Sequence, residues 1–74
     1  MSGLPVYRHY KGGMYEVVAL AKDSETQEMM VVYRSLKDQG VWVRPASMFH
    51  GMVEVPERRM VPRFERIWGF KGEG

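Results

Sequence analysis

The chain has no cysteine, only two histidines and no long apolar run. Each of these features excludes or disfavours certain kinds of structure or site. Without cysteine, neither a disulfide bond nor a thiolate zinc site can form, and the composition fits a reducing cytoplasm. No apolar stretch approaches about 18 residues, and no charged-then-apolar leader opens the chain. We therefore expect a cytoplasmic protein with neither a membrane span nor a secretory signal.

Length and charge limit the chain further. Its 74 residues leave room for one domain with one small core. We place that domain at residues 6–67, after a lead-in at residues 1–5 and before a glycine-rich tail at residues 68–74. The formal net charge of +2 permits an acidic partner. It falls short of the concentrated positive charge of a dedicated nucleic-acid binder.

Residues 14–36 give the clearest structural signal, because two valine-rich runs flank a short polar break. This pattern predicts a β-hairpin. A five-residue loop over Asp23–Gln27 would fix the register of the two strands. Opposite charges would then face each other at both ends of the hairpin, Lys22 with Glu28 and Glu16 with Arg34.

This register sorts the side chains into two faces. One face is uncharged and is predicted to line the core: Tyr15, Val17, Ala19, Ala21, Met29, Val31, Tyr33 and Ser35. The other face has an apolar centre framed by the ion pairs: Val18, Leu20, Met30 and Val32. A barrel has only one inside, so we expect this second face to be covered by Met52, Met60, Trp68 or Phe70, or by a second copy. We favour intramolecular cover, and hence a monomer over a homodimer.

Shorter segments on either side complete an all-β pattern. The predicted strands are Val6–Tyr10, Val41–Arg44, Met52–Val55 and Met60–Ile67, the last interrupted by Pro62. Pro45–Phe49 is predicted to form one helical turn, which would place Met48 and Phe49 as a lid over one end of the barrel. Five or six short strands at close spacing predict a small barrel.

Several motifs connect these segments. They are Y-R-H-Y-K-G-G-x-Y-E-V over Tyr7–Val17, S-E-T-x-E over Ser24–Glu28, V-V-Y-R, W-V-R-P-x-x-M-F over Trp42–Phe49 and V-P-R-F over Val61–Phe64. In this order and spacing the sequence resembles the small bacterial proteins of the domain-of-unknown-function family 1653, over about residues 6–67. The resemblance implies a compact β-barrel of the SH3-like kind. It implies no activity.

Catalytic and metal-binding arrangements find little support in the sequence. Ser24 and Thr26 lie in a turn, where local hydrogen bonds to the backbone are the expected role. No spacing places His9 or His50 beside a nucleophile or in a zinc motif. We therefore predict no enzyme activity, no cofactor and no metal.

The more informative pattern combines aromatic rings with arginines from separated segments. The candidate ligand-binding residues are Arg8, His9, Tyr10, Tyr15, Trp42, Arg44, Phe49, Arg63 and Phe64. Flat rings can stack on proline, bases or cations, and a guanidinium group binds carboxylate or phosphate. A domain this small also needs most of its rings for its core, and the arginines could instead pair with Glu16, Glu54 or Glu65.

Two functions remain open from the sequence. The first is a non-catalytic binding module for a peptide, a protein or an anionic ligand. The alternative is a nucleic-acid-binding barrel that uses the same arginines with stacked rings, helped by the positive charge of Arg58, Arg59, Arg63 and Arg66.

Overall fold

The computed structural model describes residues 3–68, and it confirms the all-β class. Seven strands and one helical turn follow one another in the order β1 (Val6–His9), β2 (Met14–Lys22), β3 (Met29–Ser35), β4 (Val41–Pro45), α1 (Ala46–Phe49), β5 (Met52–Val55), β6 (Arg59–Pro62) and β7 (Phe64–Trp68). The predicted last strand is two strands, because β6 ends at Pro62 and β7 begins at Phe64. A proline cannot donate to a ladder, so a strand end suits it.

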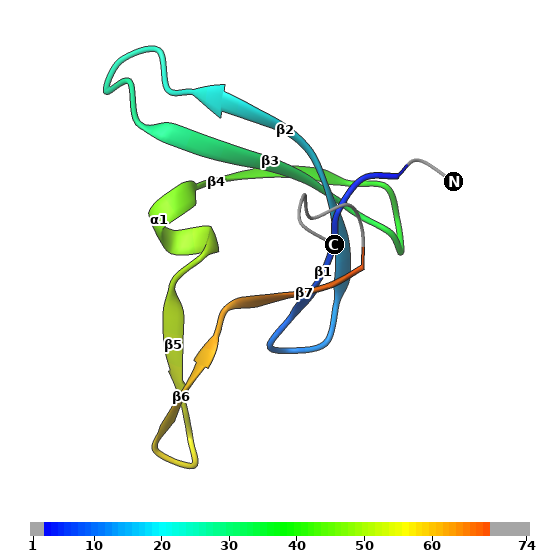
Figure 1. The fold of residues 1–74 in the computed structure, drawn as a ribbon, viewed down its shortest axis with the longest axis vertical. Helices are drawn as coiled ribbons and strands as arrows, with labels where there is room; N and C mark the ends of the chain where they lie inside the picture. Colours follow the sequence, from blue (N-terminus) through cyan, green and yellow to red (C-terminus); the bar gives the residue numbers. More distant parts are fainter. Residues whose placement is uncertain (1–2, 69–74) are drawn as a thin grey trace.

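The strands form a curled five-stranded sheet, in the order β4-β3-β2-β1-β7, and a separate β5-β6 hairpin. Within residues 3–68, the strand pairings are all antiparallel. The five-stranded sheet bends around the core but does not close into a barrel, so β4 and β7 are its edges. Figure 1 shows the β2-β3 hairpin extending at one end of the molecule and the β5-β6 hairpin at the other.

The central hairpin has the predicted register over its first half only. Glu16 faces Arg34, and the two side chains form an ion pair with Nε and Oε2 3.0 Å apart. The register then shifts by one residue at Val18, so that Lys22 faces Met29. The expected pairing of Lys22 with Glu28 is therefore wrong.

The loop between β2 and β3 explains this shift. The Asp23 backbone N–H donates to the Glu28 carbonyl at 2.9 Å, so Asp23 belongs to the ladder and not to the loop. The Asp23 carboxylate also accepts the N–H groups of Glu25 at 2.8 Å and Thr26 at 3.1 Å, as Asx turns do. These two donors lower the pKa of Asp23, that of Thr26 having the larger effect. The shorter loop leaves one surplus residue in β2, which the bulge at Val18 accommodates.

The bulge also reassigns the faces beyond it. Leu20 now faces Val31, whereas Ala19 faces Val32 on the opposite side of the sheet. Ala19 and Ala21 are exposed, so their predicted place in the core is wrong. Leu20 joins the inner face but is exposed, because this end of the hairpin extends past the core.

The core consists of four buried side chains from three parts of the chain. They are Val31 and Tyr33 on β3, Phe49 on α1 and Phe64 on β7. Partly buried neighbours pack against them: Tyr7, Tyr15, Val17 and Ala46. The helical turn is confirmed, and it delivers Phe49 to the core as expected of a lid. Met48 is exposed and takes no part in that cover.

The predicted cover of the second hairpin face is not formed by the described residues. Met52 and Met60 lie on the β5-β6 hairpin and are exposed. The side chains of Trp68 and Phe70, the other predicted cover, lie outside the described part of the chain.

Candidate functional site

Every strand of the five-stranded sheet contributes to one pocket of about 200 Å³ on the concave face. Its lining residues are His9 on β1, Tyr15 on β2, Tyr33 on β3, Trp42 and Arg44 on β4, and Phe64 on β7. The register brings them together. Tyr33 lies opposite Trp42, His9 lies opposite Phe64, and alternate residues of a strand share a face.

Edge-to-face ring contacts hold the pocket wall. The Tyr33 and Phe64 ring centroids are 5.2 Å apart, and Tyr15 contacts them at 5.4 and 5.7 Å respectively. The His9 ring meets Phe64 at 4.9 Å. All these separations lie in the range that aromatic pairs prefer. Because Tyr33 and Phe64 are also buried core residues, the wall is as rigid as the core itself.

Arg44 supplies the pocket with a permanent positive charge. Its Nε–H donates a long hydrogen bond of 3.4 Å to the Tyr33 hydroxyl, which orients the guanidinium group. The side chain is half-buried, and no carboxylate within residues 3–68 forms an ion pair with it. A guanidinium group has five N–H donors, so most of those on Arg44 are available to a ligand.

His9 is neutral at pH 7. Its Nδ1 accepts the backbone N–H of Lys11 at 3.1 Å, which places the ring proton on Nε2. Burial lowers the pKa of His9 from its ordinary value of 6.5, and the positive charges of Arg44, Arg63 and Lys11 lower it further. A cluster of cations therefore surrounds a half-buried imidazole.

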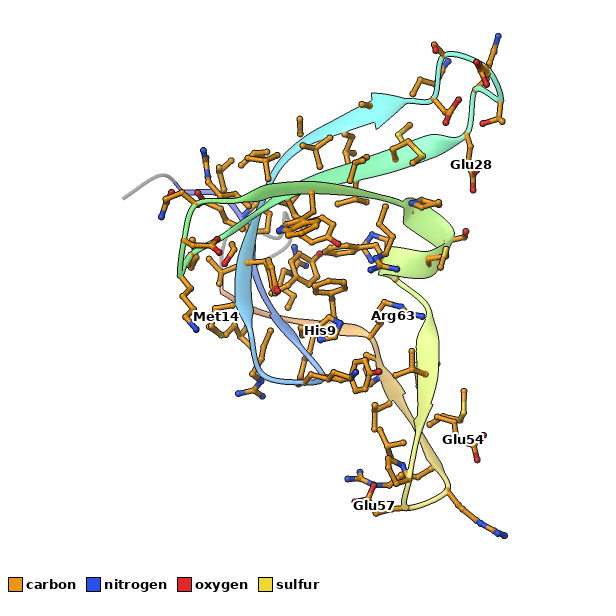
Figure 2. All side chains as sticks on the ribbon, turned by 180° about the vertical axis from the view of Figure 1, so that it is seen from behind. His9, Met14, Glu28, Glu54, Glu57 and Arg63 are labelled. Carbon is orange, nitrogen blue, oxygen red and sulfur yellow. The ribbon has the colours of Figure 1, made fainter. Side chains whose placement is uncertain are left out.

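Arg63 places a second positively charged side chain next to the pocket. Its Nε is buried and has no hydrogen-bond partner among residues 3–68. Figure 2 shows Arg63 and His9 in the interior of the molecule, while Glu54 and Glu57 lie on the distant β5-β6 hairpin. Among residues 3–68, no acidic residue lines the pocket. The local field thus favours an anion.

The structure brings together five of the nine candidate residues: His9, Tyr15, Trp42, Arg44 and Phe64. Arg63 acts on the pocket through its charge. Phe49 is a core residue, stacked on Phe64 with centroids 4.1 Å apart. Sequence reasoning placed Tyr33 in the core but missed its part in the pocket. The alternation of β3 and β4 could have shown that Tyr33 shares a face with Trp42.

Arg8 and Tyr10 lie elsewhere. The Arg8 side chain forms an exposed ion pair with Glu65 at 3.4 Å. Tyr10 is partly exposed, with the Lys11 ammonium group 5.8 Å from its ring centroid. Both residues line a second cavity of about 320 Å³, which Arg59 and Pro62 of β6 also line.

A third cavity, of about 340 Å³, lies at the bend of the β2-β3 hairpin. Its lining is mostly apolar and includes Pro5, Val17, Leu20 and His50. Polar groups that converge on one point are what distinguish a specific ligand site from an apolar hollow. The pocket around Arg44 has such groups, so we take it as the candidate site.

Within residues 3–68, no three histidine or acidic side chains lie close enough together to hold a metal ion. The helical structure in that range includes nothing long and apolar enough to cross a membrane.

The fold and its pocket define a small all-β protein built on one open, curled sheet. The chain belongs to the DUF1653 family, described as proteins of unknown function, whose sequence pattern matches residues 5–66. A crystal structure of a protein from the same family, from Bordetella bronchiseptica, is similar to it with a TM-score of 0.78 and 32% sequence identity. That match covers 95% of this chain and 92% of the other. No curated protein matches the sequence.

Proposed function

We propose that this protein is a non-catalytic binding module of the bacterial cytoplasm, and that its pocket holds an anionic group carried by a peptide, a protein or a small ligand. The observation that supports this most directly is the half-buried Arg44 guanidinium, which has no carboxylate partner among residues 3–68. The ring walls favour a ligand whose anion adjoins a flat or apolar group. Such a ligand would satisfy Arg44 with a charge-assisted hydrogen bond.

The chemistry of the pocket lining favours binding over catalysis. Among the described residues that line the pocket, the only general base is His9, and none is a serine, threonine or cysteine. Covalent catalysis needs a nucleophile within hydrogen-bond reach of a base. A neutral imidazole among cations fits another role, that of a group which takes up a proton when an anion binds.

Benzoate is a suitable probe, because it joins a carboxylate to one aromatic ring, and benzyl alcohol is its neutral counterpart. We expect benzoate to shift the Trp42 indole N–H resonance in two-dimensional NMR spectra, and benzyl alcohol to bind much more weakly. Arg44→Gln should weaken benzoate binding by about 10- to 100-fold, since charge-assisted hydrogen bonds contribute about 1.5–3 kcal/mol and about 1.4 kcal/mol corresponds to a factor of ten.

The matched control is Arg58→Gln, which removes the same charge from the turn between β5 and β6. It should leave benzoate binding unchanged. The proposal fails if Arg44→Gln binds benzoate as tightly as the wild type does, provided that its spectrum shows a folded protein. It also fails if benzoate and benzyl alcohol bind alike.

Nucleic acid remains the alternative ligand, supported by the second cavity, where Arg8 and Arg59 lie beside the exposed ring of Tyr10. Acidic groups weaken this case, because Glu65 pairs with Arg8 and Glu57 lies close to Arg59 in the sequence. A nucleic-acid binder would show affinity for single-stranded RNA or DNA that falls steeply with salt. Loss of that affinity in Arg59→Gln but not in Arg44→Gln would favour the alternative.

A further inference from the structure

The outer edge of β4 is unusual among the free strand edges of this protein. Three consecutive residues of β4 are exposed and uncharged: Val41, Trp42 and Val43. The other edge of the same sheet, β7, has Glu65 and Arg66 at its centre, and the two strands of the small hairpin contain Glu54 and Arg59. Charged residues protect an edge from pairing with another strand. The first three residues of β4 lack that protection.

The backbone of β4 is also arranged for pairing. The Ser35 N–H donates to the Gly40 carbonyl at 2.8 Å, and Ser35 and Gly40 continue the β3-β4 register by one step. Hydrogen-bonded pairs in an antiparallel ladder recur at every second residue, so Trp42 and Arg44 direct their backbone groups toward β3. Val41 and Val43 direct theirs outward, where the described part of the sheet has no further strand. Pro45 is the N-cap of α1, so its carbonyl is directed into that helical turn.

We propose that β4 pairs antiparallel with β4 of a second copy of this chain, about a two-fold axis at Val43. In this register each Val43 N–H donates to the Val43 carbonyl of the other copy. Pro45 has no N–H to leave unpaired, so the position where β4 lacks a donor lies at the end of the new ladder.

The side chains fit the same register. On the outer face, Val43 meets its own counterpart and Val41 meets Pro45, so apolar side chains cover one another. On the concave face, Trp42 lies opposite Arg44 of the second copy in a non-hydrogen-bonded pair, where side chains come closest. A guanidinium group over an indole ring is a favourable cation–π contact. A two-fold contact must be self-complementary, and this one is.

Pairing at this edge would also change the candidate site. Trp42 and Arg44 both line the pocket, so the second copy would add an arginine at the rim of each pocket. The two pockets would then lie side by side on one continuous sheet. The pairing rests on the β4 edge alone and does not depend on which ligand the pocket holds.

The absence of cysteine makes a disulfide cross-linking test specific, since any engineered cysteine is the only thiol in the chain. Val41 and Val43 are matched for this purpose, because both lie on the outer face of β4 and both are 57% exposed. We expect Val43→Cys to give a disulfide-linked dimer under mild oxidation. Val41→Cys should cross-link at least tenfold more slowly, because it would face Pro45. Equal rates would indicate random collision and overturn the proposal.

Sedimentation of the cysteine-free protein provides the second measurement. The wild type should show a concentration-dependent dimer, and Val43→Lys should abolish it by placing two like charges at the two-fold axis. Leu36→Lys, an equally drastic change at another exposed apolar residue, should leave the dimer intact. The proposal is wrong if the wild type stays monomeric at all concentrations, or if Val43→Lys and Leu36→Lys dimerise alike.

Discussion

Val31→Ala tests whether the core is where the structure places it. Val31 is 1% exposed at the centre of β3, between Leu20 on β2 and Arg44 on β4. The substitution removes two buried methyl groups, which contribute about 1.6 kcal/mol at about 0.8 kcal/mol for each carbon. Incomplete collapse of the cavity adds to that loss, so we expect about 2 kcal/mol of destabilisation.

The size of the domain determines how this loss would be measured. At about 0.05–0.15 kcal/mol per residue, 74 residues have a free energy of unfolding of about 4–11 kcal/mol. The variant should therefore remain folded. In a domain this small, a loss of 2 kcal/mol lowers Tm by about 8–16 °C, since each kcal/mol corresponds to about 4–8 °C. Thermal unfolding followed by circular dichroism resolves such a change easily.

Val43→Ala is the matched control for the same substitution on the next strand. Val43 is exposed on the outer face, so its truncation should change stability by no more than about 0.5 kcal/mol. Both variants should be measured at low protein concentration, where association through β4 does not contribute. If the two variants lowered Tm equally, the assignment of the concave face as the core would be wrong.

Two further predictions concern charged groups. Burial and nearby cations lower the pKa of His9 in the folded state, so the unfolded chain binds more protons as the pH falls below 6.5. The free energy of unfolding should therefore decrease on acidification through that value. Thermal melts at several pH values should show a smaller decrease for His9→Gln than for the wild type. Glu16→Gln should lower the free energy of unfolding by about 1 kcal/mol, because the Glu16 side chain is only 14% exposed in its ion pair with Arg34. Glu65→Gln should lower it by almost nothing, because the Glu65 side chain is 60% exposed in its ion pair with Arg8. Equal effects of the two glutamine variants in urea unfolding would contradict this.

The sequence was sufficient to predict the strands and the register near Glu16. Apolar residues alternate clearly there, and Arg34 provides a partner of opposite charge at the right position. The bulge at Val18 was not predictable from alternation, because a run of five apolar residues from Val17 to Ala21 fits either face. The deciding interaction is local to the loop. The Asp23 carboxylate binds two backbone N–H groups and so shortens the loop by one residue.

The chemistry of the candidate site was predictable from the sequence, but the full set of residues that form it was not. The combination of rings and arginines identified Trp42 and Arg44, and W-V-R alternation places both on one face of a strand. The sequence pattern does not show how far the sheet curls, and this curl decides that Phe49 reaches the core while Arg8 faces solvent. That curvature comes from contacts between β1, β7 and α1, which are distant in the sequence.

The same rings serve as core and as pocket wall, and this has a consequence for how any function could be separated from stability. Tyr33 and Phe64 are buried, and both line the pocket, so their replacement would affect folding and binding together. Arg44 lines the same pocket, but it is half-buried and is not one of the packed rings. A substitution of Arg44 can change the charge of the pocket while leaving the packed rings in place. A binding role for the pocket is therefore testable through Arg44 and not through its aromatic residues.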